Sequence, residues 1–331
     1  MTEIIEENKN NTIDGVFGFA IADAVGVPAE FKSRSTLSIR PITDMVGYGT
    51  HNQPAGTWSD DSSMTIATMD SINECEKINY SDMMKKFAEW KNESKYTATG
   101  DFFDIGISTS SAINNYLRGI EPTKCGGTGI RDNGNGSLMR ILPVVLYLHL
   151  QELSYDKETE IINECSALTH GHEISKMGCR IYADYIKAIL DGKSKEEALE
   201  SISTIDYTDY YSQETVKYYK RIIDGSVINL PEQSIKSSGF VVDTLEASIW
   251  CAHNTKDYKS SVLKAVNLGD DTDTVGAVTG SITGLLYGYN NIPNNWRNGL
   301  QNKEYLMDIC KKFDKTINKE STKDKQIEIS R

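Results

Sequence analysis

Hydrophobic residues recur along most of this chain at the three- and four-residue spacing of helices, and clean alternation of polar and apolar positions is nearly absent. One such stretch opens at Ser81-Asp82 and places Met84, Phe87, Ala88 and Trp90 on one side. The same pattern predicts helices over residues 102–116, 137–150, 158–168, 174–190, 243–252, 258–266, 275–289 and 302–317. We therefore expect an all-α protein of roughly ten or more helices.

Residues typical of helix ends and helix starts separate these segments, but they do not divide the chain into two domains. Asp191-Gly192 is typical of a helix end, and Ser194 can cap the helix that follows. Because we see no linker in the middle, we expect one compact domain over residues 12–313. The polar segments 1–11 and 314–331 are expected to be frayed or solvated tails.

Two predicted helices carry small residues at every fourth position, which places each set on one side of its helix. The first set is Gly18, Ala22 and Gly26, and the second is Gly276, Gly280, Gly284 and Gly288. A glycine inside a helix costs about 0.5–1 kcal/mol relative to alanine, so close approach of another backbone must offset it. We expect these two helices to lie at the centre of the fold.

Composition and charge narrow the function classes. The 331 residues are 39% apolar and 25% charged, which is typical of a globular protein, and the net charge is −12. An acidic surface disfavours general binding to nucleic acid or to anionic membranes. The sequence has neither a secretory leader pattern nor a long uninterrupted apolar run, and its six cysteines include no C-x-x-C pair. We expect a soluble, cytoplasmic protein with reduced thiols and no membrane partner.

Two acidic clusters, each followed by a predicted helix, are the strongest candidates for chemistry. The first lies in residues 56–64 around Ser59, Asp60 and Asp61, and the second in residues 267–276 around Asp271 and Asp273. Helix capping alone would explain a single acid in each cluster. Closely spaced carboxylates repel each other unless a cation neutralises them, and oxygen ligands suit Mg²⁺ or Mn²⁺. Both clusters could therefore converge on the same metal ions.

Two further segments could bind a ligand. A Gly/Asn-rich loop over residues 126–136 precedes an apolar segment, and such a loop can offer backbone N–H groups to a phosphate, although it could equally be an ordinary connection. His170 and His172 follow a predicted helix, where a histidine is more often structural than catalytic. Walker, zincin, EF-hand and nucleophile-elbow patterns do not occur in the sequence.

Taken together, these segments resemble the ADP-ribosylglycohydrolase family, which includes the dinitrogenase-reductase-activating glycohydrolase. The resemblance covers residues 13–300 and rests on seven motifs in the family's order. They are residues 18–30, 57–62, 104–106, 135–140, 168–170, 238–247 and 267–276. The resemblance implies a compact single-domain orthogonal helix bundle in which two Mg²⁺ or Mn²⁺ ions lie in a cleft. The metal ligands that it implies are Ser59, Asp60, Asp61, Asp271, Asp273 and Thr274.

The resemblance also implies an activity, namely release of ADP-ribose from an ADP-ribosylated protein. Asp60 or Asp271 would take a proton from the attacking water, and Glu30 would act as acid for the leaving group or as a substrate clamp. Asp23 is a weaker candidate of the same kind. Substrate contacts are expected from Asn133, Gly134, Asn135, Gly136 and Ser137, from His170 near the adenine, and from Phe240, where relatives often have tyrosine.

The choice of linkage depends on Asp132, which precedes Asn135 by three residues as in arginine-directed relatives. A carboxylate there could grip a guanidinium in a bidentate pair, which favours ADP-ribosyl-arginine as the substrate. An O-linked substrate, such as ADP-ribosyl-serine or O-acetyl-ADP-ribose, a nucleic-acid adduct, and a non-catalytic ADP-ribose-binding role stay open as alternatives. Asp270 stands where many relatives have glycine and adds an acid near the site.

Overall fold

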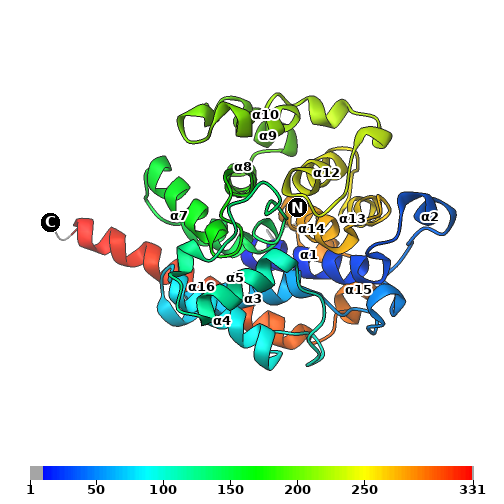
Figure 1. The fold of residues 1–331 in the computed structure, drawn as a ribbon, viewed down its shortest axis with the longest axis horizontal. Coiled ribbons are helices and arrows are strands. Elements are labelled where there is room, and N and C mark those ends of the chain that lie inside the picture. Colours follow the sequence, from blue (N-terminus) through cyan, green and yellow to red (C-terminus); the bar gives the residue numbers. More distant parts are fainter. Residues whose placement is uncertain (1–9, 330–331) are drawn as a thin grey trace, which may run out of the picture.

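The computed structural model describes the backbone of residues 10–329 and the side chains of residues 10–319. Regular structure in this part of the chain is helical, with three isolated β-bridges and no strand (Figure 1). The α-helices are α1 (Asn11–Gly26), α2 (Arg34–Ile39), α3 (Asp60–Cys75), α4 (Tyr80–Glu93), α5 (Ile107–Leu117), α6 (Leu142–His149), α7 (Tyr155–Ala167), α8 (Glu173–Leu190), α9 (Lys195–Ser203), α10 (Gln213–Tyr218), α11 (Lys220–Ile223), α12 (Val241–His253), α13 (Tyr258–Val266), α14 (Thr272–Tyr287), α15 (Asn294–Gly299) and α16 (Lys303–Ile329). The all-α prediction is confirmed.

Most predicted helices appear within a few residues of their expected limits, and the differences have local causes. The segment expected from residue 102 becomes helical only at Ile107, because Asp104 has φ +54° and Gly106 is extended. The segment expected from residue 137 forms a short 3₁₀ turn before α6 begins at Leu142. Pro143 explains this break, since proline lacks an N–H group and fits only the first turn of a helix.

The chain ends differ from the expected tails in one respect. Residues 1–9 of the expected amino-terminal tail lie outside the described residues, and Asn10 caps α1. The polar segment after residue 313 continues α16 as far as Ile329, and Thr316 and Ile317 in it are buried. The domain limits of 12 and 313 stay a prediction.

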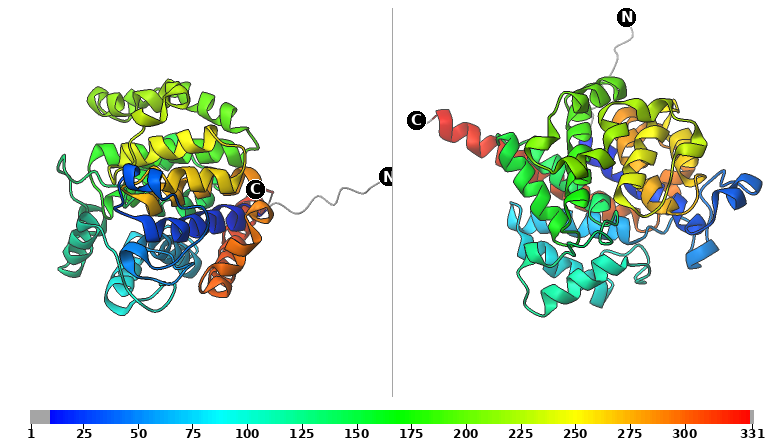
Figure 2. Two further views of the ribbon diagram at one scale, coloured as in Figure 1. Left: turned by 90° about the vertical axis from the view of Figure 1, so that its right-hand side faces the viewer. Right: turned by 45° about the horizontal axis from the view of Figure 1, so that its top comes forward.

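Helices α1 and α14 form the centre of the molecule, as the small-residue pattern predicted (Figure 2). The structure shows in addition that the two helices run antiparallel. A Cβ atom added to Gly18 would lie 2.4 Å from the carbonyl oxygen of Gly280, so the two backbones are in direct contact. At the other end of the pair, the Thr272 hydroxyl donates to the carbonyl of Gly26 over 2.8 Å. The carboxyl end of α1 therefore lies beside the amino end of α14.

The remaining helices enclose this pair and leave its polar end accessible. Helices α12 and α13 pack on α14, while α3 and α16 pack on α1 and on each other. Helix α8 packs beside α12, and α9 lies on the outer side of these two helices (Figure 1). The carboxyl end of α1, the amino end of α3 and the amino end of α14 thus meet at one place.

Residues Asn11–Ala29 are apolar and long enough to cross a membrane, with a mean hydropathy of 1.3. No membrane-spanning segment was expected from the sequence, which has no long uninterrupted apolar run. However, 94% of the window is buried inside the protein, where α1 packs against α14 and α16. Its position at the centre of the helical core accounts for its hydropathy.

We expect Gly18→Ala to lower the free energy of unfolding by about 3 kcal/mol or more, because the new methyl group would collide with the backbone of α14. Gly15→Ala, one turn earlier, is the matched control. The atoms nearest to its methyl group would belong to the Leu285 and Leu142 side chains, at 3.2–3.4 Å. Urea denaturation measures both variants, and equal stabilities would contradict the close backbone contact.

Candidate active site

Seven carboxylate side chains gather where α1, α3 and α14 meet. They are Asp23, Glu30, Asp60, Asp61, Asp104, Asp271 and Asp273. Asp104 and Asp271 are half-buried and the other five are buried. Among the described residues that line the adjoining cavity, there is no lysine or arginine. The site therefore has a strongly negative potential that no side chain of its wall offsets.

Asp23, on α1, fixes the start of α3. Its carboxylate accepts hydrogen bonds from the backbone N–H groups of Ser59, at 3.0 Å, and Ser62, at 3.1 Å, and from the Ser62 hydroxyl at 2.6 Å. Burial raises the pKa of Asp23 to about 6, although these hydrogen bonds oppose that shift. A residue that the sequence ranked as a weak candidate is thus a central support of the site.

The structure brings the two acidic clusters together. The Thr274 hydroxyl, at the start of α14, donates to Asp61 Oδ1 of α3 over 3.3 Å, although the two residues are 213 positions apart. The Asn135 amide donates to Asp271 Oδ2 over 2.8 Å, which joins the Gly/Asn-rich loop to the same place. Ser59 belongs to the cluster as the cap of α3, with its Oγ atom accepting from the Asp61 N–H group.

The acidic residues suit divalent cations. Oxygen atoms of Asp23, Asp61 and Asp273 lie within 4.8 Å of one another, and so do those of Glu30, Asp271 and Asp273. Within the described structure, Asp61 Oδ2 and Asp271 Oδ1 are buried without a hydrogen-bond partner. Burying a charged oxygen without a partner is costly, and a cation would remove that cost.

The pKa values of these carboxylates are also consistent with a site for divalent cations. Burial, together with the charges of neighbouring carboxylates, raises the pKa values of Asp60, Asp61 and Asp273 well above the ordinary aspartate value. Burial is also the main cause of the raised pKa of Asp271. Two positive charges of a bound cation would favour the ionised carboxylates and reverse these shifts.

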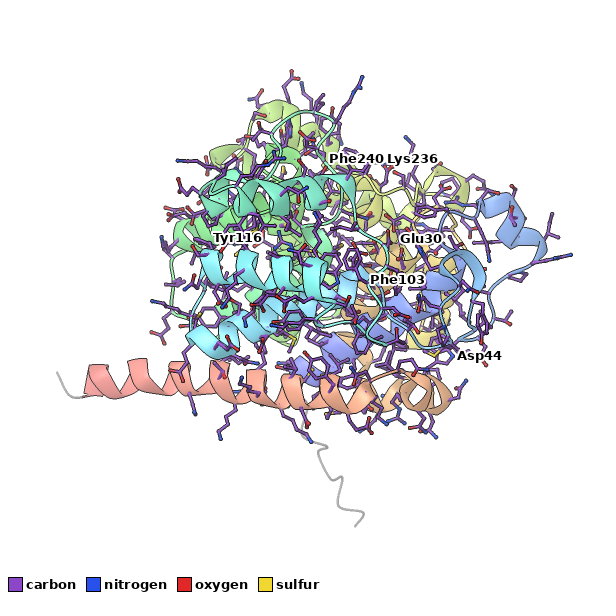
Figure 3. The ribbon with its side chains drawn as sticks, turned by 60° about the horizontal axis from the view of Figure 1, so that its bottom comes forward. Glu30, Asp44, Phe103, Tyr116, Lys236 and Phe240 are labelled. Atoms are coloured by element: carbon purple, nitrogen blue, oxygen red, sulfur yellow. The ribbon has the colours of Figure 1, made fainter. Side chains whose placement is uncertain are left out.

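Glu30 lies on the wall of the cavity and is held by a loop that the sequence analysis did not consider. His51 Nε2 contacts Glu30 Oε2, and the Thr50 hydroxyl donates to the Glu30 carbonyl over 2.6 Å. The centroid of the His51 ring lies 6.0 Å from that of Phe31 and 5.3 Å from that of Phe103. Figure 3 labels Glu30 and Phe103 on this side of the molecule. Burial and the charge of nearby Asp104 raise the pKa of Glu30 to about 10.

Asp104 also lines the cavity, although the sequence analysis gave it no role. The sequence did contain a signal, since residues 104–106 form one of the seven motifs. The role of Asp104 was missed because a helix was expected over residues 102–116. A side chain inside that helix would not be expected to point toward α3. The left-handed backbone of Asp104, with φ +54°, turns the chain before α5.

A cavity of about 400 Å³ adjoins the acidic cluster. Its walls include Gly134, Asn135 and Gly136 of the Gly/Asn-rich loop, together with His170. A Cβ atom on Gly136 would lie only 2.8 Å from the His170 ring, so glycine allows this loop to approach the histidine. Burial and the Arg140 charge lower the pKa of His170 to about 3, which keeps the ring neutral.

Two of the expected substrate-binding residues point elsewhere. The Asp132 carboxylate accepts a hydrogen bond from the Gly129 N–H group over 2.9 Å and does not line the cavity. The Phe240 ring packs edge-on against Tyr218, with a centroid distance of 6.0 Å, and the preceding Gly239, not Phe240, lines the cavity. Their roles in substrate binding stay predictions that would require the ligand to reach beyond this cavity.

Asn133 and Ser137 support the loop from behind. Asn133 Oδ1 accepts hydrogen bonds from the backbone N–H group of Ser175, at 3.2 Å, and from its hydroxyl, at 3.1 Å, which ties the loop to α8. Ser137 is fully buried and accepts a hydrogen bond from the Ser166 hydroxyl over 2.9 Å. Neither side chain lines the cavity. In this structure both residues position the backbone of residues 134–136.

Comparison with known proteins shows that the chain is similar to proteins named as hydrolases of ADP-ribose linkages. A sequence model described as ADP-ribosylglycohydrolase matches residues 6–323. The chain is 30% identical over 312 residues to an ADP-ribosylarginine hydrolase, Tri1, of Serratia proteamaculans, and the match covers 93% of this chain and 80% of that protein.

Two further similarities support the comparison. The chain is 24% identical to the ADP-ribosyl-[dinitrogen reductase] glycohydrolase of Rhodospirillum rubrum, across 89% of this chain and 91% of that protein. A solved structure described as an ADP-ribosylglycohydrolase-related protein complex superimposes with a TM-score of 0.79 at 25% identity. That superposition covers 95% of this chain and 100% of the other.

Proposed function

Because this chain belongs to the ADP-ribosylglycohydrolase family, we propose that it is a metal-dependent hydrolase that releases ADP-ribose from ADP-ribosylated protein side chains, with ADP-ribosyl-arginine as its main substrate. The observation that supports this most strongly is the meeting of two distant acidic clusters beside a cavity. Buried carboxylate oxygens there lack a partner among the described atoms. A purely structural role gives no reason for two unpartnered buried oxygens within a cluster of seven acids.

We further propose that two divalent cations, Mg²⁺ or Mn²⁺, bind at the acidic cluster. The residues that would hold them are Ser59, Asp60, Asp61, Asp271, Asp273 and Thr274. When bound, such ions stabilise developing negative charge and lower the pKa of water at the site.

The protein's own residues would divide the remaining work. Asp60 or Asp271 would accept the proton of the attacking water, since both carboxylates line the cavity. Glu30, held by His51, would assist departure of the side chain from the ribose or clamp the sugar. The backbone of Gly134 and Gly136 would contact the diphosphate.

The arginine linkage is supported by the names of relatives rather than by a guanidinium site in this structure. Two ADP-ribosylarginine hydrolases, each 30% identical to the chain, are among them. Asp132 would have to exchange its hydrogen bond with Gly129 for one with the guanidinium. The decisive experiment incubates the protein with arginine-, serine- and acetyl-linked ADP-ribose, each with Mg²⁺, with Mn²⁺ and with EDTA.

Release of ADP-ribose from the arginine compound in Mg²⁺ or Mn²⁺, and not in EDTA, would support the proposal. Preferred cleavage of the serine or acetyl compound would replace the arginine linkage by an O-linked one. Tight binding of ADP-ribose without turnover of any compound would indicate a non-catalytic binding protein.

We expect Asp132→Ala to reduce kcat/KM for ADP-ribosyl-arginine about tenfold or more, because one partner of a charge-assisted pair is lost. Turnover of the serine compound should not change, since serine presents no cation. Asp101→Ala removes an exposed acid elsewhere and is the control. An equal loss on both linkages would show that Asp132 supports the loop rather than selecting arginine.

A further inference from the structure

Arg140 is fully buried behind the cavity without a carboxylate partner among the described residues. Its Nη2 atom donates to the Cys165 carbonyl over 3.0 Å and to the Thr169 hydroxyl oxygen over 2.8 Å. The guanidinium also lies over the Phe87 ring, 4.8 Å from its centroid. A guanidinium only donates hydrogen bonds, so the oxygen of Thr169 must be the acceptor in this pair.

The Thr169 hydroxyl then has one hydrogen left to donate. Thr169 Oγ1 lies 2.9 Å from His170 Nδ1, and within the described structure this nitrogen is the one acceptor within reach of the hydroxyl. Thr169 is fully buried. If Nδ1 carried a proton, the hydroxyl hydrogen would be buried without an acceptor, which is unfavourable. Nδ1 is therefore the acceptor, and the ring proton of neutral His170 lies on Nε2.

The Nε2 side of the ring faces the ligand cavity. A Cβ atom on Gly134 would lie 3.2 Å from His170 Nε2, and Gly134 and His170 both line the cavity. The backbone of His170 is fixed as well, because its N–H donates to the Ser166 carbonyl over 2.8 Å and its carbonyl accepts from the Ser166 hydroxyl over 3.0 Å. The backbone that carries the ring is therefore held in place.

We propose that Arg140 and Thr169 are positioning residues that hold His170 in its Nε2–H tautomer, so that the histidine presents a hydrogen-bond donor to an oxygen of the bound ligand. The identity of that ligand as ADP-ribose rests on the proposed function. The tautomer itself does not, since it follows from contacts within the protein. Neither Arg140 nor Thr169 lines the cavity, so both act through His170.

The first test uses the unaltered protein. Histidine labelled with ¹⁵N in both ring nitrogens is incorporated, and long-range ¹H–¹⁵N spectra report which nitrogen carries the proton. His170→Gln identifies the signals of this ring among the five histidines. We expect a neutral ring that is protonated at Nε2 at pH 7. Protonation at Nδ1, or an average of both tautomers, would overturn the proposal.

The second test compares Thr169→Val with Thr169→Ser. Valine has nearly the shape of threonine but no hydroxyl, whereas serine keeps the hydroxyl. We expect the valine variant to bind ADP-ribose about tenfold more weakly in Mg²⁺, as one hydrogen bond is lost or misdirected, and the serine variant to bind as the unaltered protein does. Calorimetry gives the affinities. Unchanged affinity together with an unchanged tautomer in the valine variant would overturn the proposal, and if that variant does not fold, the spectra of the unaltered and serine proteins decide it.

The tautomer of His170 and the binding of ADP-ribose can be tested separately. If the unaltered protein shows the Nε2–H tautomer but does not bind ADP-ribose, the proposed function fails and the role of Arg140 and Thr169 in setting the tautomer stands. If it binds ADP-ribose while His170 carries its proton on Nδ1, the positioning role fails and the proposed function stands.

Discussion

Asp271→Asn is expected to reduce the rate of ADP-ribose release by about 10³-fold or more while leaving the fold intact. Asparagine keeps the size of the side chain, and its oxygen can still accept the hydrogen bond from Asn135. The variant loses the negative charge of the carboxylate. One oxygen of that carboxylate, Oδ1, is buried without a hydrogen-bond partner in the described structure. An amide oxygen binds a divalent cation more weakly than a carboxylate does, and it cannot accept the proton of the attacking water.

The neighbouring Asp270→Asn is the matched control. Asp270 is exposed, and its backbone pairs with Phe31 and Lys32 through hydrogen bonds of 2.7 and 2.8 Å. Asparagine tolerates the left-handed conformation at this position, where φ is +60°. Activity of Asp270→Asn should therefore stay close to that of the unaltered protein. Full turnover by Asp271→Asn, or equal losses in both variants, would contradict the role given to Asp271.

Removal of divalent cations with EDTA is expected to lower the melting temperature, and to lower it more at pH 8 than at pH 5. At a free Mg²⁺ concentration of 100 times the dissociation constant, one bound ion adds about 2.7 kcal/mol, or about 4 °C for a chain of this length. Differential scanning fluorimetry in EDTA and in MgCl₂, with KCl at matched ionic strength as the control, measures the effect. A melting temperature that is independent of Mg²⁺ at both pH values would exclude the proposed ions.

The pH dependence follows from the buried carboxylates. In the absence of cations, Asp60, Asp61 and Asp273 have pKa values well above the value of about 4 in the unfolded chain, and that of Asp23 is about 6. A group whose pKa is raised on folding stabilises the protein fully below the unfolded pKa, and this contribution disappears as the pH rises through the folded pKa. The cation-free protein should thus become less stable from pH 4 toward pH 8. Bound cations oppose this loss, because they favour the ionised carboxylates.

The architecture and the meeting of the two acidic clusters were predictable, because both depend on local signals. Helical periodicity indicated the fold class, and the spacing of Gly18 and Gly280 with their neighbours indicated that these two helices are central and closely approached by another backbone. The structure shows that they contact each other. Each acidic cluster lies at the amino end of a helix, the first at α3 and the second at α14. Contact between α1 and α14 therefore brings Asp271, just before α14, near the part of the chain that follows α1. The contact of Thr274 with Asp61 confirms that arrangement.

The surrounding loops could not be predicted in the same way. His51 reaches Glu30 across 21 positions of chain with little regular structure, and no periodicity in the sequence indicates that contact. The direction of Asp132 depends on a turn that offers it the Gly129 N–H group, which a substrate would have to displace. Such contacts depend on backbone geometry in loops, where one changed dihedral angle redirects a side chain.

The antiparallel contact of α1 and α14 has a consequence for how the protein is made. The two helices that carry opposite sides of the site lie near opposite ends of the chain, and the Thr272 hydroxyl bonds to a carbonyl 246 positions earlier. During synthesis the ribosome releases Asp23 and Asp61 long before Asp271 exists. A nascent chain that stops anywhere before α14 therefore lacks half of the site and leaves the apolar surface of α1 without its main neighbour. Such unfinished chains should be inactive and should depend on chaperones until α14 emerges.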